Sequence, residues 1–210
     1  MPIPWNDDPP GSEAQIQANI AKLLARIHID ASPRVEPSMA MAQLWHRDIY
    51  EGIPLPVPYY AGEFRDSDAS LPELFGYEVR IGPHFAVASD LVPAELGAFE
   101  RGIQRAIRIL DGLISSSPTD VSQLQDVIAA SALAHGEWVR IHPFANGNGR
   151  TARMWVRWIT ARYNLPAYLS VKPRPPAHDY DIASAASMTG DHAPMEAFLM
   201  AALIKAVSTP

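Results

Sequence analysis

The chain has 210 residues, of which 48% are hydrophobic and 19% charged, so it can bury a core and is not a disordered polymer. Its formal net charge of −6 argues against nucleic acid as a partner. The absence of cysteine excludes disulfides, zinc–thiolate sites and cysteine nucleophiles.

Neither a signal peptide nor a membrane span is recognisable. The first eight residues are acidic and broken by proline, unlike a signal peptide. The longest apolar segment, residues 197–207, contains Lys205 and is too short to cross a bilayer. We therefore expect a cytoplasmic protein without a membrane partner, and leave open its export as an effector by a signal that this pattern does not reveal.

The N-terminal part, residues 1–37, is predicted to be an arm and a helix in front of a main domain at residues 38–210. The arm, residues 1–11, is rich in proline and glycine, which predicts disorder. A helix is expected to begin at Ser12, with Gln15 as its capping-box partner.

The main domain is predicted to be mostly helical. Apolar residues recur at helical spacing in segments at about 38–50, 94–113, 121–139, 149–163, 180–188 and 194–207. Alternation at 77–81 and 85–88, around a Gly-Pro turn, predicts a short β-hairpin. We expect an all-α fold of about seven or eight helices, with this one hairpin lying on the helical body.

One segment, residues 141–153, joins an imidazole, two Asn-Gly pairs and two arginines just before a helix. Glycine allows close approach of the backbone to a ligand and positive φ angles. A helix start presents free N–H groups and the positive end of the helix dipole. Together these parts predict an anion site suited to phosphate, with His142 beside it as a base or nucleophile.

Residues 142–153, His-Pro-Phe-Ala-Asn-Gly-Asn-Gly-Arg-Thr-Ala-Arg, closely resemble the Fic family motif His-Pro-Phe-x-Asp/Glu-Gly-Asn-Gly-Arg-x-x-Arg, and eight of its nine specified positions match. The segment from Gly62 to Arg65, the helix before the motif and the closing helices are similar to the family as well. The resemblance extends over roughly residues 40–205 and implies a helical Fic fold whose hairpin serves as a flap.

The resemblance implies an adenylyltransferase that moves AMP from ATP to a Ser, Thr or Tyr hydroxyl of a target protein and releases pyrophosphate. His142 would be the catalytic base. The phosphates of the nucleotide would be bound by Gly147, Asn148, Gly149, Arg150 and Arg153. The target would dock by strand addition on the flap, at Val79, Arg80, Ile81, Gly82 and Phe85. If control is not built into the chain, it would come from a separate small antitoxin-like inhibitor or be absent.

One position departs from the family pattern. Asn146 stands where Asp or Glu usually helps to hold Mg²⁺, and an amide oxygen can ligate the ion only without a charge. Mg²⁺ would then be held mainly by the triphosphate, or the donor would differ from ATP, or nucleotide would be bound with little transfer. The alternatives to AMP transfer are therefore transfer of phosphate, UMP or phosphocholine, and a catalytically weak nucleotide-binding interaction domain.

Many family members carry an inhibitory pattern, Ser/Thr-x-x-x-Glu-Gly/Asn, whose Glu pairs with the second motif arginine. Ser32 and Glu36 have this spacing and form the candidate inhibitory pair, although Pro37 replaces the final Gly or Asn. Proline at this place disfavours helix at the residue before it.

Other patterns have simpler explanations. Residues 147–152 also fit the dinucleotide fingerprint Gly-x-Gly-x-x-Ala, which needs a preceding strand where we predict a helix. His135 and His142 are two helical turns apart, but no third metal ligand is evident, so packing explains His135 better. Surface or loop positions are expected for His46 and the remaining histidines, and solvated helix faces for Arg140, Arg157 and Arg162.

Overall fold

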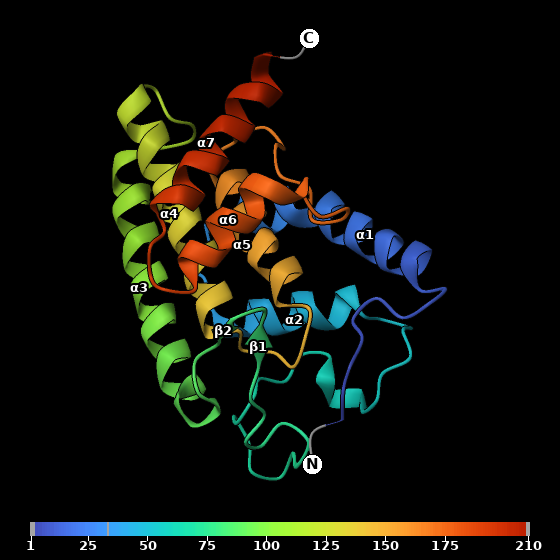
Figure 1. Ribbon diagram of the computed structural model, residues 1–210. Helices are drawn as coiled ribbons and strands as arrows, with labels where there is room; N and C mark the ends of the chain where they lie inside the picture. The colour runs from blue at the N-terminus through green and yellow to red at the C-terminus, as the bar shows by residue number, and fades with distance from the viewer. Residues whose placement is uncertain (1–2, 33, 209–210) are drawn as a thin grey trace.

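The computed structural model describes residues 3–32 and 34–208, so the first two residues of the predicted arm, Pro33 and the last two residues lie outside the described part. The helices within that part are α1 (Glu13–Ala31), α2 (Met39–Ile49), α3 (Val92–Leu113), α4 (Val121–Ile141), α5 (Asn148–Arg162), α6 (Ala177–Ser187) and α7 (Ala193–Ser208). With a single two-stranded hairpin beside these seven helices in the described chain (Figure 1), the predicted all-α fold is confirmed. None of these helices has the length and apolar character needed to cross a membrane.

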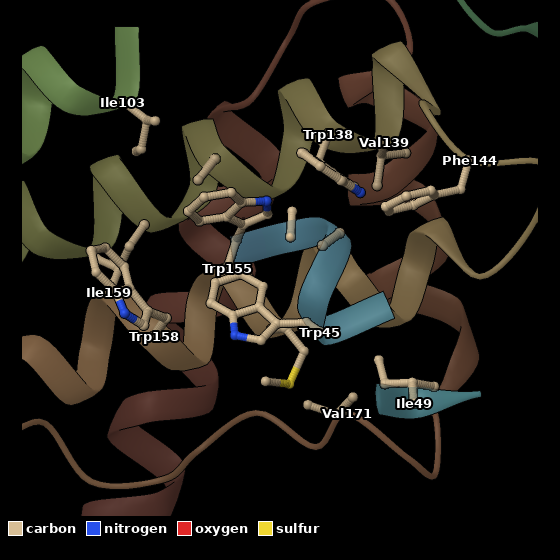
Figure 2. Packing of buried hydrophobic residues seen from close by; sticks show 14 of the residues in the cluster. Trp45, Ile49, Ile103, Trp138, Val139, Phe144, Trp155, Trp158, Ile159 and Val171 are labelled. Atoms are coloured by element: carbon tan, nitrogen blue, oxygen red, sulfur yellow. The ribbon is translucent and has the colours of Figure 1, made fainter. Parts of the chain in front are cut away.

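Helix α5 lies at the centre of the fold, packed between α4 on one side and α1 and α2 on another (Figure 1). Nearly all of its side chains are buried. Trp155 of α5 lies 4.9 Å from Trp45 of α2 and 5.8 Å from Trp138 of α4, measured between ring centroids (Figure 2). Buried aromatic rings of this kind each stabilise a core by several kcal/mol, so α5 is held firmly.

A second cluster of buried side chains fixes α6 and α7 on α4. Ile128 of α4, Val156 of α5, Tyr180 of α6 and Leu199 of α7 meet in it. Because α4 and α5 contribute to both clusters, the two helices at the ends of the short connecting loop are both anchored in packed core. This loop carries the motif identified in the sequence.

The hairpin is shorter than predicted. Strand β1 (Arg80–Ile81) pairs antiparallel with β2 (His84–Phe85), and the turn between them uses Gly82 at φ +57. One further bond joins the Ala86 N–H to the Val79 carbonyl. Beyond it the Val87 N–H donates to the Arg140 carbonyl of α4, so the flanking chain is bonded to the helical body instead of extending the ladder.

The start of α1 also differs from the prediction. The Ser12 hydroxyl donates to the Pro9 carbonyl at 2.6 Å, and the Gln15 amide donates to the side-chain oxygen of Asn19. Ser12 already has near-helical backbone angles, φ −88 and ψ −9, whereas a capping residue is usually extended. The predicted capping box therefore does not form.

The arm was predicted to be disordered, and this is wrong for residues 3–11. The ring of Trp5 is 7% exposed and lies edge-on to Tyr50, with 4.7 Å between ring centroids. The Ile3 N–H and carbonyl both bond the Tyr60 hydroxyl, at 3.1 and 2.9 Å. Composition alone predicts disorder here because it gives no weight to one large aromatic residue that finds a pocket.

Candidate active site

A cavity of about 520 Å³ opens beside the loop between α4 and α5. One part of its wall comes from the motif, namely His142, residues 146–150 and Arg153. The rest comes from the arm at residues 7–8, the hairpin at Ile81, the loop at residues 171–174 and four residues on helices, which are Glu13, Val139, Tyr180 and Ser184. The predicted base and the predicted phosphate-binding residues therefore line one cavity.

The chain reverses between α4 and α5 through two residues in the left-handed region. His142 ends α4 at φ 52 and ψ 58, and Gly147 precedes α5 at φ 75. A Cβ on Gly147 would lie 2.4 Å from the Tyr50 hydroxyl oxygen and 2.8 Å from His46 Nε2, so no other residue fits. The tight turn leaves the first N–H groups of α5 without intrahelical acceptors at the cavity, as an anion site requires.

The imidazole of His142 is set up to accept a proton. Its Nδ1 lies 2.8 Å from the Val139 carbonyl oxygen, which can only accept, so Nδ1 carries the hydrogen. Nε2 is therefore the basic nitrogen. Burial is the main cause that lowers the pKa of His142, to about 4, and the ring is neutral at physiological pH.

Arg65 holds the backbone at His142 in place. Its Nε donates to the His142 carbonyl at 2.8 Å, and its Nη2 donates to the Ile141 carbonyl at 3.0 Å. The same guanidinium reaches the carbonyls of Tyr77 and Val87, at 2.6 and 3.1 Å, on the two flanks of the hairpin. The side chain is fully buried. Arg65 thus connects the loop between α4 and α5 to the hairpin, a role that only the family resemblance of residues 62–65 could have suggested.

The loop is also fixed from the inside. The side chain of Asn148 exchanges two hydrogen bonds of 2.9 Å with the backbone of Phe144, so this side chain supports the loop instead of facing a ligand. Phe144 is fully buried and stacks on His46, with 3.7 Å between ring centroids and 11° between ring planes. Figure 2 shows Phe144 at the edge of the tryptophan core.

His46 was predicted to lie at the surface, and this is wrong. It is fully buried, accepts a hydrogen bond from the Gly62 N–H through Nδ1 and donates to the Asn146 carbonyl through Nε2, both at 3.0 Å. Burial lowers its pKa to about 3, so the ring stays neutral and keeps both bonds. The sequence did carry a signal, because His46 shares the buried face of α2 with Ala42 and Ile49.

The two motif arginines reach the cavity from α5 and are both nearly buried, at 8% exposure for Arg150 and 5% for Arg153. Arg153 donates to the Val171 carbonyl through Nε and Nη2, at 3.1 and 2.9 Å, and to the Tyr180 hydroxyl at 3.0 Å. Arg150 donates to the Tyr50 hydroxyl at 2.6 Å and is paired with acidic residues of the arm. Both guanidinium groups are therefore oriented before any ligand binds.

Asn146 does not offer a free metal ligand. Its side-chain oxygen accepts the Gly147 N–H at 2.9 Å, which also means that this N–H is not open to phosphate, and its amide donates to the Trp5 carbonyl at 2.8 Å. In the described chain no group of three His, Cys, Asp or Glu side chains could hold a metal ion. The residues present therefore do not fit a protein-held Mg²⁺, and a bound Mg²⁺ would depend on oxygen atoms from the nucleotide.

The flap residues lie beside the cavity. Ile81 forms part of its wall, while Phe85 is 70% exposed and lies under the Arg80 guanidinium at 5.4 Å. Val79 and Gly82 complete the predicted docking set along the same hairpin.

The candidate inhibitory pair is not brought to the second motif arginine. Ser32 is the residue that follows α1, and Glu36 pairs with Arg108 of α3 at 3.5 Å. Arg153 is engaged elsewhere, by Val171 and Tyr180. The structure therefore separates the two groups that this inhibitory pattern would join.

The other basic and imidazole side chains have structural roles. Arg162 was expected on a solvated helix face, which is wrong: it is 4% exposed and pairs with Asp111 of α3 at 2.6 Å. Arg157 is only partly exposed, and Arg140 forms ion pairs with Glu95 and Glu137. His135 is fully buried and bonds the Tyr180 hydroxyl at 2.8 Å, as expected for a packing residue.

The fold and the site together define a helical protein in which a histidine and two arginines surround the start of a buried helix. The model of the Fic/DOC family matches residues 36–160, which is more than half of the chain, and the chain therefore belongs to this family. Over 109 residues it is 29% identical to "Protein adenylyltransferase Fic" of Nematostella vectensis. The match covers 52% of this chain but only 20% of that relative.

Solved structures share the fold. A Fic domain containing signaling protein from Bacteroides thetaiotaomicron superimposes with a TM-score of 0.66 at 16% identity, covering 98% of this chain and 74% of its own. A Fic family protein from Desulfovibrio desulfuricans gives 0.63 at 23% identity, covering 95% and 55%. BepC, a VirB-translocated effector protein of Bartonella tribocorum solved with bound AMPPNP, gives 0.57 at 16% identity, covering 91% and 85%.

Proposed function

We propose that the protein is a protein adenylyltransferase, which transfers AMP from ATP to a Ser, Thr or Tyr hydroxyl of a target protein. The observation that carries the proposal is the basic Nε2 of His142 on the wall of the cavity that also holds the start of α5 and both motif arginines. The adenylyltransferase name of the Nematostella relative and the AMPPNP bound to BepC support a nucleotide as the donor.

In this mechanism the target hydroxyl oxygen attacks the α-phosphorus of ATP while His142 Nε2 removes its proton. The bond from the α-phosphorus to the oxygen of the β-phosphate breaks, and pyrophosphate leaves. The N–H groups at the start of α5 bind phosphate oxygens, and Arg150 and Arg153 neutralise the charge on the leaving pyrophosphate. The flap holds the target main chain by strand addition next to Ile81.

The transferred group can be identified with labelled ATP. In a lysate with α-³²P-ATP, label that requires the added protein and is lost with His142→Ala is expected, whereas γ-³²P-ATP should give no such label, because the γ-phosphate leaves with pyrophosphate. Mass spectrometry of the labelled protein should show the mass of AMP on a hydroxyl side chain. Label from the γ-position would establish phosphotransfer instead, and no label from either position would favour a nucleotide-binding domain without transfer.

We further propose that Mg²⁺ enters with the nucleotide and is held mainly by its phosphates. Asn146→Asp is then expected to lower the Mg²⁺ concentration for half-maximal transfer by about 10-fold or more, since a carboxylate adds a full negative charge next to the ion. Transfer rates measured over a Mg²⁺ titration test this expectation.

Asn146→Ala is the matched control for that titration, because it removes the bond to the Trp5 carbonyl without adding a charge. If the aspartate and alanine variants need the same Mg²⁺ concentration, position 146 does not contribute to metal binding.

A further inference from the structure

The acidic N-terminal arm lies across the phosphate-binding part of the cavity. Asp7 accepts from Arg150 Nη1 through a carboxylate oxygen at 2.8 Å and through its carbonyl at 2.9 Å. Asp8 accepts from Arg150 Nη2 at 2.7 Å, and its second carboxylate oxygen is paired with Lys172. The arm thus places two carboxylates against one guanidinium and one ammonium group.

A phosphate group could bind to Arg150 and Lys172 in place of the two carboxylates. A guanidinium fork donates along two directions that match the oxygens of a carboxylate or a phosphate equally well. The side chains of Arg150 and Lys172 are each only 9% exposed. Asp7 and Asp8, at 28% and 47% side-chain exposure, are much more open to water. All four side chains line the cavity, but the two cations lie deep in its wall and the two carboxylates cover them from the solvent side.

The arm is held by a second, uncharged contact. Trp5 packs edge-on against Tyr50 and lies 5.8 Å from the ring of His46, and its carbonyl accepts from the Asn146 side chain. The anchor therefore rests on α2 and on the loop that precedes α5. The ion pairs of Asp7 and Asp8 are partly exposed, and such pairs contribute about 1 kcal/mol or less each. A polyanion can therefore compete with the two carboxylates for the cations.

We propose that Asp7 and Asp8 are a tethered mimic of phosphate, which occupies a subsite formed by Arg150 and Lys172 and competes there with the β- and γ-phosphates of the nucleotide. This inference rests on the proposed function of the cavity as a nucleotide site. It adds Lys172 to the phosphate-binding residues and makes release of the arm a condition for tight binding of ATP. It is independent of Ser32 and Glu36, which lie apart from this subsite.

Direct binding measurements separate this inference from the transfer reaction. Calorimetric titration of Asp7→Asn/Asp8→Asn with ATP is expected to give a dissociation constant at least about 10-fold lower than that of the unaltered chain, if the released arm is populated to about 10% or less. AMP, which lacks the β- and γ-phosphates, should bind both proteins equally. Asp48→Asn is the matched control, because Asp48 is also a partly exposed carboxylate paired with an arginine, Arg26 of α1.

Equal or weaker ATP binding by the double variant would overturn the inference, as would an equal gain for AMP. Tighter ATP binding without transfer from α-labelled ATP would uphold the arm and refute the adenylyltransferase. Transfer of label from α-labelled ATP without tighter ATP binding would uphold the adenylyltransferase and refute the inference about the arm.

A second measurement leaves the acidic residues intact. Because the chain has no cysteine, Pro10→Cys gives a single labelling position on the exposed side of the arm. A nitroxide there should become more mobile when pyrophosphate is added and should not respond to AMP. Unchanged mobility at saturating pyrophosphate would show that the arm does not leave the site, and the inference would fail.

Discussion

Replacing His142 by alanine should abolish transfer of AMP while ATP still binds. Removal of a general base typically lowers a rate by about 10²–10⁴-fold, and the phosphate-binding groups on α5 remain in the variant. The measurement is the rate of label transfer from α-³²P-ATP, together with the dissociation constant of ATP from calorimetry. Loss of binding along with loss of rate would contradict a purely catalytic role for this residue.

The left-handed backbone at His142 calls for a matched variant. Alanine is strained at φ 52, whereas asparagine adopts this region more readily and can still donate to the Val139 carbonyl. Asparagine has no basic nitrogen, so His142→Asn should be as inactive as His142→Ala. An active asparagine variant would show that the residue acts through its conformation and not as a base.

The pH dependence of the rate provides a signature of the same group. The pKa of His142 is lowered to about 4, so the neutral base is lost only as the pH falls through that value. The rate should therefore stay level down to roughly pH 5, whereas a base with an ordinary histidine pKa of about 6.5 would already have lost most of its rate there. A half-maximal rate near pH 6.5 would contradict the burial of this imidazole.

Replacing Arg65 by methionine is expected to cause the largest loss of stability, about 3 kcal/mol or more. The change leaves four backbone carbonyls without their charged donor, and each buried acceptor that loses its partner costs about 1–3 kcal/mol. Urea unfolding measures the loss. Transfer activity should fall more than stability alone explains, because the carbonyl of His142 is one of the four acceptors.

Two variants calibrate the Arg65 measurement. Arg65→Lys keeps the charge but lacks the planar fork, so an intermediate loss of stability is expected. Arg108→Ala removes an arginine whose side chain is 68% exposed, and its effect should stay within about 0.5 kcal/mol. If Arg65→Met is as mild as Arg108→Ala, the link between loop and flap is not important for folding.

The helices and the site loop could be predicted from the sequence because both depend on local patterns. Helical spacing of apolar residues predicted α2 to within one residue at each end, residues 38–50 against Met39–Ile49. The order of glycines, asparagines and arginines after His142 predicted a helix start at an anion site, and α5 begins within that segment. Such features require only neighbours along the chain.

The parts that could not be predicted depend on contacts between distant segments. Arg65 bonds carbonyl groups, which leave no trace in the types of the residues that provide them. Asp7 meets Arg150 across 143 positions of sequence, and nothing in a proline-rich acidic stretch indicates which cation it will find. Burial of Trp5 is equally invisible, because its pocket is built from residues of α2 and the segment after it.

Helix α5 contributes its first turn to the cavity and its later turns to the core, and the cavity therefore has a rigid side and an adaptable side. The first turn of α5 is the proposed phosphate site and its following turns belong to the tryptophan core, so we expect the geometry of that turn to change little without opening of the core. Much of the facing wall consists of an arm, a two-residue hairpin and a proline-rich loop, which lie outside the long helices. Amide hydrogen exchange should therefore be slow along α5 and fast on the facing wall. Variation of substrate within such a fold can be confined to the facing segments, without disturbing the atoms that position phosphate.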